Sequence, residues 1–228
     1  MISTINQTWK NKDVPFNVFP KSWIDSWTEY YPTWNYKLWT DEDNRNLIKT
    51  QYPEFLKIYD SYTFNINRAD VIRYFILNTY GGIYTDLDCI AMKSMAQLLE
   101  NKSLALGAEP YTNALSYGKQ LFLSNALMYS EPNHPFWQVV FEQIKNPGNI
   151  GGPVFQTGPG LLTKAYEIYS QTNNDCYIID YNDFIWSSDT TRNEIEKMWF
   201  KDGKRPEDAY VIHANVSVWV TNADEIKK

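Results

Sequence analysis

Hydrophobic side chains recur along the chain with two periods, one typical of strands and the other typical of helices. Strands are predicted over residues 2–8, 35–39, 81–88, 103–107, 120–128 and 177–179, with an alternating segment over 210–220. Helices are predicted over residues 21–30, 40–50, 68–80 and 135–145, in part over 52–64, and up to residue 169 after a turn at 157–160. Because strands and helices interleave, we expect an α/β sandwich with a mostly parallel central sheet.

The helix over residues 68–80 has an apolar face and is followed by Gly81, which supplies a left-handed stop. A helix of about twelve residues covers ~18 Å, and a strand of about six covers ~20 Å. The next strand should therefore return to the level of the helix's first turn. That return is expected to bring together Arg68, Asp70, Arg73, Asp86 and Asp88.

Two carboxylates, Asp86 and Asp88, stand one residue apart where the strand over residues 81–88 ends. In an extended backbone, side chains two positions apart share a face, so we expect both acids to converge on one small volume. Paired carboxylates and substrate phosphates commonly hold a hard divalent cation, so the pattern predicts a metal–diphosphate site. The alternative is two solvated acids on an edge strand, but the uncharged approach over residues 81–84 favours a central strand.

Asp70 and Arg73 are separated by three residues and therefore share a helix face. We expect a charged pair at the rim of the carboxylate site. The alternative is a first-turn acid that stabilises the helix dipole and makes an ordinary surface ion pair with Arg73. Both interpretations are compatible with each other.

Composition narrows the classes of function. The chain has 228 residues and no linker-like stretch, which indicates one domain over residues 1–228. A net charge of -6 without a basic block argues against a nucleic-acid partner. No apolar run is long enough to span a bilayer, so we expect no transmembrane segment. The two cysteines, Cys89 and Cys176, lack metal-ligand spacing, which argues against a zinc site or a disulfide scaffold.

Five short segments occur in a fixed order: 7–10, 36–41, 68–74, 81–88 and 157–160. Together they resemble the DXD-containing sugar transferases of glycosyltransferase family 32, which are related to initiating α-mannosyltransferases and mannosyl-inositol-phosphoceramide synthases. The likeness runs from about Thr4 to Trp219. The resemblance implies a GT-A (Rossmann-like) fold, Mn2+ or Mg2+, a nucleotide-sugar donor, and transfer with retention of anomeric configuration.

The resemblance also extends to the glucosyltransferase domains of large glucosylating toxins and implies roles for single residues. Asp88 would bind the metal directly, and Asp86 would contact the donor and reach the metal through water. The implied catalytic set is Asp70, Arg73, Asp86 and Asp88. The implied donor-binding set is Gln7, Thr8, Trp9, Arg68, Asp70, Arg73, Tyr84, Asp86, Ser217 and Trp219, with Trp9 against the base.

The carboxyl-terminal segment departs from the family pattern. Relatives commonly have two adjacent histidines before a Ser-Trp pair, whereas this chain has the single His213, followed by Ser217 and Trp219. His213 is expected as a further metal or phosphate ligand. The alternative is a strand histidine that bonds a backbone carbonyl. Asn6 also stands where relatives tend to have histidine.

We therefore expect a glycosyltransferase that moves a hexose from GDP-mannose or a UDP-sugar to a hydroxyl of a glycan or glycolipid. Glu109 and Asn125, after predicted strands, are candidates for the acceptor side, with ordinary loop roles as the alternative. Two other functions stay open: a nucleotide-sugar or carbohydrate-binding module without catalysis, and a DxD phosphatase. Family relatives act in the secretory pathway, but the missing membrane anchor favours a cytoplasmic enzyme.

Overall fold

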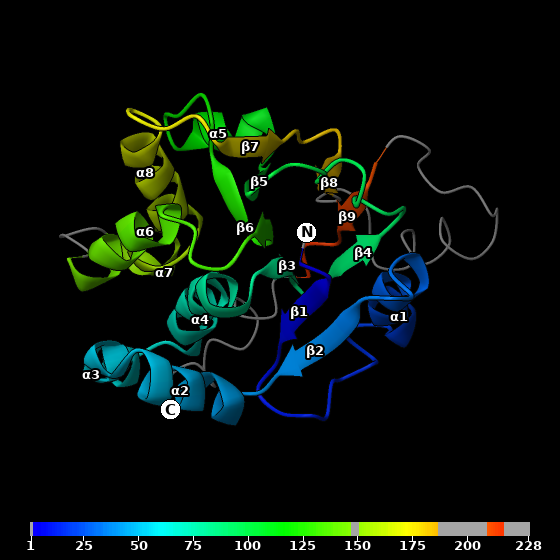
Figure 1. Cartoon of the computed structure of the whole chain (residues 1–228), viewed down its shortest axis with the longest axis horizontal. Helices are drawn as coiled ribbons and strands as arrows, with labels where there is room; N and C mark the ends of the chain where they lie inside the picture. Colours follow the sequence, from blue (N-terminus) through cyan, green and yellow to red (C-terminus); the bar gives the residue numbers. More distant parts are fainter. Residues whose placement is uncertain (1, 147–150, 187–208, 217–228) are drawn as a thin grey trace.

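The computed structural model describes residues 2–146, 151–186 and 209–216. Six strands form a central sheet in the order β2-β1-β3-β6-β5-β7 (Figure 1). They are β1 (Thr4–Thr8), β2 (Asn35–Trp39), β3 (Gly82–Thr85), β5 (Leu104–Ala108), β6 (Leu123–Ser130) and β7 (Cys176–Ile179). Of these six, only β6 is antiparallel to its neighbours β3 and β5, while β1, β2, β3, β5 and β7 share one direction. The predicted mostly parallel sheet is confirmed.

A small second sheet follows directly after the acidic segment. Its strands are β4 (Cys89–Ala91), β9 (Val211–His213) and β8 (Phe184–Trp186), in the order β4-β9-β8. β4 pairs antiparallel with β9 in a register that sets Cys89 opposite His213. This sheet therefore carries a residue from the end of the chain to the segment that follows β3. The predicted alternating strand over residues 210–220 is shorter, because β9 ends at His213 and residues 217–220 lie outside the described residues.

Helices cover both faces of the central sheet (Figure 1). They are α1 (Lys21–Tyr30), α2 (Asp41–Gln51), α3 (Leu56–Ser61), α4 (Asn65–Tyr80), α5 (Tyr111–Ser116), α6 (Phe136–Lys145), α7 (Gly152–Gln156) and α8 (Pro159–Tyr169), with a 3-10 turn at Pro53–Phe55. One core lies between the sheet and α2, α4, α6 and α8, and it includes Tyr84. A second core on the other face includes Trp27 of α1 and Ile83. Successive side chains of β3 point to opposite faces of the sheet, so Tyr84 packs in the first core and Ile83 packs in the second.

The turn from α4 into β3 requires glycine. Gly81 and Gly82 have φ angles of 65° and 90°, in the region that side chains with a Cβ rarely adopt. A Cβ on Gly82 would lie 2.4 Å from the carbonyl oxygen of Thr4, so β1 could not pair as closely with β3. These two glycines therefore allow the helix to reverse into a buried central strand.

Local signals placed most elements close to their observed bounds. α1 and β2 coincide with the predicted ranges, and the predicted cap at Thr40 is confirmed by a reciprocal capping box with Asp43. α4 begins at Asn65, earlier than predicted, and α5 and β8 were not predicted. Among the described residues, no helix combines the length and the apolar character that crossing a membrane requires.

The predicted strand over residues 81–88 is wrong at its end. β3 stops at Thr85, and the amide of Cys89 donates to the carbonyl of Asp86 at 3.0 Å, which closes a turn. Asp86 and Asp88 therefore occupy a turn between β3 and β4 rather than one face of an extended strand. The physical reason is that the chain leaves the central sheet here and enters the small one.

Candidate active site

A cavity of about 350 Å³ opens at the edge of the central sheet where β1, β3 and β5 end. Ligand sites in α/β sheets commonly lie beyond the carboxyl ends of the strands. Thr8 and Trp9 at the end of β1, the turn of residues 86–88 after β3, and Glu109 after β5 all line it. Asp70 and Arg73 of α4 and His213 of β9 also line the cavity.

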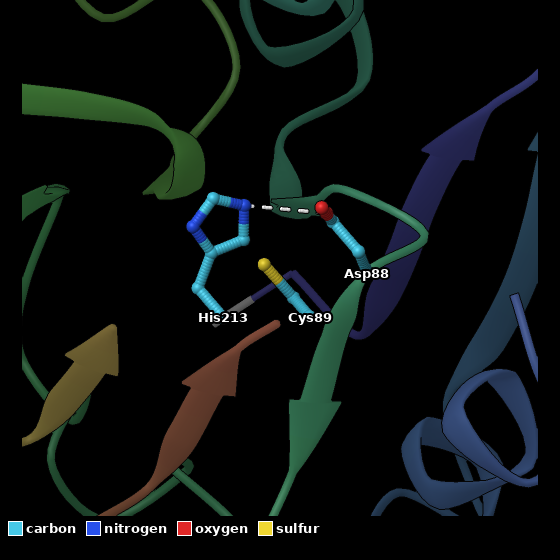
Figure 2. A group of neighbouring side chains, drawn as sticks. All are labelled: Asp88, Cys89 and His213. Atoms are coloured by element: carbon cyan, nitrogen blue, oxygen red, sulfur yellow. Dashed lines mark ion pairs between the residues drawn. The ribbon is translucent and has the colours of Figure 1, made fainter. Parts of the chain in front are cut away.

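Asp88 and His213 form an acid–base pair in the lining of this cavity. His213 Nε2 lies 3.2 Å from Asp88 Oδ1, and the backbone amide of Val216 donates to Asp88 Oδ2 at 2.9 Å. Burial by itself favours the neutral form of both side chains. The opposite charge of each neighbour outweighs it, lowering the pKa of Asp88 and raising the pKa of His213. Figure 2 shows the carboxylate directed at the imidazole ring, beside Cys89.

The donor atoms of this pair fit a hard divalent cation. Adjacent ligands of an octahedral ion with bonds of 2.0–2.2 Å lie roughly 3 Å apart, which matches the 3.2 Å between Asp88 Oδ1 and His213 Nε2. Among the described residues, Asp88, Cys89 and His213 are the one group of three potential ligands with donor atoms within 4.8 Å of one another. Burial raises the pKa of Cys89 well above its ordinary value, which keeps it a neutral thiol. Mn2+ and Mg2+ are hard cations that disfavour sulfur ligands, so Asp88 and His213 would hold the ion and Cys89 would not.

Asp86 lines the same cavity, but its carboxylate belongs to a different network. Arg73 Nη1 lies 3.1 Å from Asp86 Oδ1, and the hydroxyl of Tyr84 donates to the same oxygen at 3.0 Å. The side-chain amide of Gln7 donates to the Asp86 carbonyl at 3.0 Å. Asp86 and Asp88 therefore line one cavity, as predicted, but they reach it from a turn and make different contacts. Both acids border the cavity, and Asp86 is fixed by three neighbours.

The predicted charged pair of Asp70 and Arg73 is confirmed. Arg73 Nη2 lies 3.3 Å from Asp70 Oδ1, and both side chains are buried. Asn125 and Thr157 donate to the two oxygens of Asp70 at 2.9 and 3.0 Å. Burial raises the pKa of Asp70 to about 6, a rise that Arg73 and the two hydrogen bonds limit. Arg73 therefore links Asp70 and Asp86 into one buried ionic network.

Two members of this network were not identified from the sequence. The hydroxyl of Thr157 accepts from Asn67 Nδ2 at 2.8 Å while it donates to Asp70. The hydroxyl of Tyr74 donates to the Thr157 carbonyl at 2.8 Å. Gly158 lets this segment approach, since a Cβ there would lie 3.1 Å from Asp70 Oδ2. The Thr-Gly pair before α8 is the only sequence signal of this contact, and it does not reveal the partner.

The other residues implied by the resemblance occupy three kinds of position. Thr8 and Trp9 line the cavity, and the Trp9 ring packs edge-on against Phe19 at 5.2 Å. Gln7 and Tyr84 are fully buried beneath it and contact Asp86 rather than the open space. Ser217 and Trp219 lie outside the described residues.

The expected position of Arg68 beside the two acids is not observed. Its guanidinium donates to the carbonyl of Tyr62 at 2.6 Å and to the side chain of Asn65. Arg68 does not line the cavity, whereas Ala69 and Asp70 do. The reason is that α4 begins earlier than predicted, so Arg68 lies on a flank of the helix and bonds the preceding turn.

Part of the sequence that forms this cavity matches a known protein family. Residues 20–105 match the family described as the glycosyltransferase sugar-binding region containing the DXD motif. The chain belongs to the DXD-containing sugar transferases. The matched region includes Asp70, Arg73 and both acids of the DXD motif, Asp86 and Asp88.

Two fungal relatives extend the likeness over most of the chain. The inositol phosphoceramide mannosyltransferase 2 of Schizosaccharomyces pombe is 36% identical over 172 residues, which cover 73% of this chain and 46% of that protein. The mannosyl phosphorylinositol ceramide synthase CSH1 of Saccharomyces cerevisiae is 37% identical over 178 residues, which cover 75% of this chain and 43% of that protein. The aligned part thus spans less than half of these relatives.

The fold has a counterpart among solved structures. The galactosyltransferase LgtC, solved with donor and acceptor sugar analogues, superposes with a TM-score of 0.53 at 9% identity, covering 99% of this chain and 96% of LgtC. This likeness concerns the fold, which is the GT-A type expected from the resemblance.

Proposed function

We propose that this glycosyltransferase transfers a hexose from a nucleoside-diphosphate sugar to a hydroxyl of a glycan or glycolipid, with GDP-mannose as the leading donor and UDP-sugars as the other candidates. The mannosyltransferase names of the fungal relatives support mannose. The cavity beside the DXD turn supports a bound donor, because it combines an acidic cation site with polar side chains for sugar hydroxyls.

One observation carries the proposal: the donor atoms of Asp88 and His213 lie 3.2 Å apart on the wall of that cavity. This spacing suits two neighbouring ligands of Mn2+ or Mg2+. When bound, such an ion would supply positive charge that stabilises the nucleoside-diphosphate leaving group. The backbone amide of Val216, which donates to Asp88 Oδ2, keeps the carboxylate in place for this role.

The Asp70–Arg73–Asp86 network is proposed to orient the donor sugar. Arg73 holds both carboxylates at 3.1–3.3 Å, so their positions are fixed before a donor arrives. The same ion pairs, together with the hydrogen bonds of Asn125 and Thr157 to Asp70, lower the nucleophilicity of both carboxylates. This arrangement supports retention through front-face attack of the acceptor hydroxyl over a covalent sugar adduct.

A nucleotide-sugar panel tests the proposal. The thermal midpoint of the protein is measured with GDP-mannose, UDP-glucose, UDP-galactose and UDP-N-acetylglucosamine, each with and without Mn2+, and donor turnover is followed by nucleoside-diphosphate release. We expect one donor to stabilise the protein most, with Mn2+ increasing the shift. Binding without turnover on any acceptor would favour a binding module. Turnover of an aryl phosphate without nucleotide sugar would favour a phosphatase, against the proposal.

A further inference from the structure

We propose that Glu109 forms the acceptor subsite of this cavity, where its carboxylate accepts a hydrogen bond from a hydroxyl of a polyhydroxylated ring and Tyr117 packs against that ring. This inference rests on the proposed function, because it needs a donor site on the opposite wall. Nothing in the DXD motif or in the family match, which ends at residue 105, assigns these two residues.

The sheet places Glu109 across the cavity from the DXD turn. β6 separates β3 from β5, and Tyr84 and Leu106 flank the same residue of β6, Met128. Because β3 and β5 run in the same direction, the segments that follow them leave the sheet at the same edge. Two strand spacings separate them, which is about 10 Å. Asp86, Glu109 and Asn125 of β6 all line the same cavity, whose volume of about 350 Å³ has room for a sugar ring.

Glu109 itself has the character of a ligand-binding carboxylate. It is 6% exposed and lines the cavity, and its backbone amide is fixed by the carbonyl of Phe122 at 2.9 Å. Within the described part of the chain, no Lys or Arg forms an ion pair with it, and Asn113 Nδ2 approaches one oxygen at 3.4 Å, a long hydrogen bond. This hydrogen bond and the charge of His213 compensate the buried carboxyl only in part, which points to a further partner supplied by substrate. Burial also raises its pKa to about 7.

Tyr117 supplies an aromatic face to the same cavity. It follows α5, lines the cavity and stacks on Phe122 with ring centroids 4.4 Å apart and an interplanar angle of 22°. Phe155 packs edge-on against it at 5.4 Å, so the ring orientation is fixed, yet 42% of Tyr117 stays exposed. A fixed, partly exposed aromatic ring in the same cavity as a hydrogen-bond acceptor is suited to a sugar or cyclitol, whose faces are apolar and whose edges carry hydroxyls.

The test compares acceptor kinetics of single variants at saturating donor and Mn2+, with methyl α-mannoside, methyl β-galactoside and myo-inositol as acceptor probes. Glu109→Gln and Glu109→Ala are expected to raise the acceptor KM by about 10- to 100-fold, with a smaller effect on kcat and with the donor Kd from calorimetry within twofold of wild type. Tyr117→Phe should retain the wild-type KM, whereas Tyr117→Ala should raise it several-fold. Glu100→Gln, which changes an exposed glutamate outside the cavity lining, is the charge-matched control.

The outcomes separate the two proposals. An enzyme that turns over donor but shows the same acceptor KM in wild type and Glu109→Ala contradicts the acceptor subsite alone. The same holds if none of the three probes accepts or competes in a wild-type protein that hydrolyses the donor. A wild-type protein that neither binds nor turns over any donor contradicts the proposed function instead. If donor Kd rises as much as acceptor KM in Glu109→Gln, the residue has a general structural role and the inference is wrong.

Discussion

His213 Nε2 lies 3.2 Å from Asp88 Oδ1 although the two residues stand far apart in the sequence. Pairing of β4 with β9 creates this contact, because Cys89 and His213 are cross-strand partners and Asp88 directly precedes Cys89. A histidine from the end of the described chain thus completes a site that begins with the DXD motif.

Replacement of His213 should weaken metal activation more than it weakens the fold. Mutation of residues that merely support a metal ligand typically costs 10- to 100-fold in metal affinity. Because His213 is proposed as a ligand itself, His213→Asn is expected to raise the Mn2+ concentration for half-maximal donor turnover at least about tenfold. The matched control is His134→Asn, which changes a buried histidine that pairs with Asp175 at 3.4 Å outside the cavity lining. Equal Mn2+ requirements in both variants would contradict the role of His213.

Loss of the Arg73 guanidinium should destabilise the fold strongly. Arg73→Met leaves the buried carboxylate of Asp70 and the half-buried carboxylate of Asp86 without their cation, and breaking a buried pair in this way typically costs about 3–5 kcal/mol. The measurement is urea unfolding of wild type and variant. Arg45→Met removes an exposed pair with Asp60 at 2.7 Å and should leave the midpoint nearly unchanged. Similar shifts in the two variants would show that the buried network contributes little.

The stability of the protein should fall as pH rises through the titration of Glu109. Burial raises its pKa from 4.5 to about 7, so the folded state holds the proton more tightly than the unfolded state. The stabilising contribution of the protonated Glu109 carboxyl is therefore fully present below pH 4.5 and is lost as pH rises through about 7. Glu109→Gln should remove about 2 kcal/mol of the decline between pH 5 and pH 8. Asp70, with its pKa raised to about 6, titrates in the same range in both proteins.

Chemical denaturation at pH 5 and pH 8 checks this linkage. At pH 8 the variant should be more stable than wild type, because it carries no buried charge at this position. If the free energy of unfolding falls between pH 5 and pH 8 as much in Glu109→Gln as in wild type, the pH dependence belongs to other groups.

Local sequence signals accounted for much of the fold. The amphipathic pattern of α1, the capping box at Thr40 and the glycine stop at Gly81 are each encoded within a few residues, and each lies where it was predicted. The family resemblance added the GT-A topology, which periodicity by itself does not specify. Helix geometry also predicted the contact of Asp70 with Arg73.

The rest of the site depends on pairings between distant segments. The end of β3 could not be placed because Asp86 and Asp88 continue an apolar, strand-like run, and only the pairing of β4 with β9 shows that the chain changes sheets. The contact of Thr157 with Asp70 arises where α7 and α8 meet α4, which no local pattern reports. Glu109 was visible as an acid after a strand, but its burial became evident only with α5 packed beside it.

Calorimetric titration of Mn2+ into the protein tests the central claim most directly. Wild type with the nucleoside diphosphate of its preferred donor should bind one Mn2+ saturably. Asp88→Asn, which keeps the shape of the side chain and an acceptor for the Val216 amide, should bind it at least about tenfold more weakly. Wild type that takes up no Mn2+, or Asp88→Asn with wild-type affinity, would contradict the account.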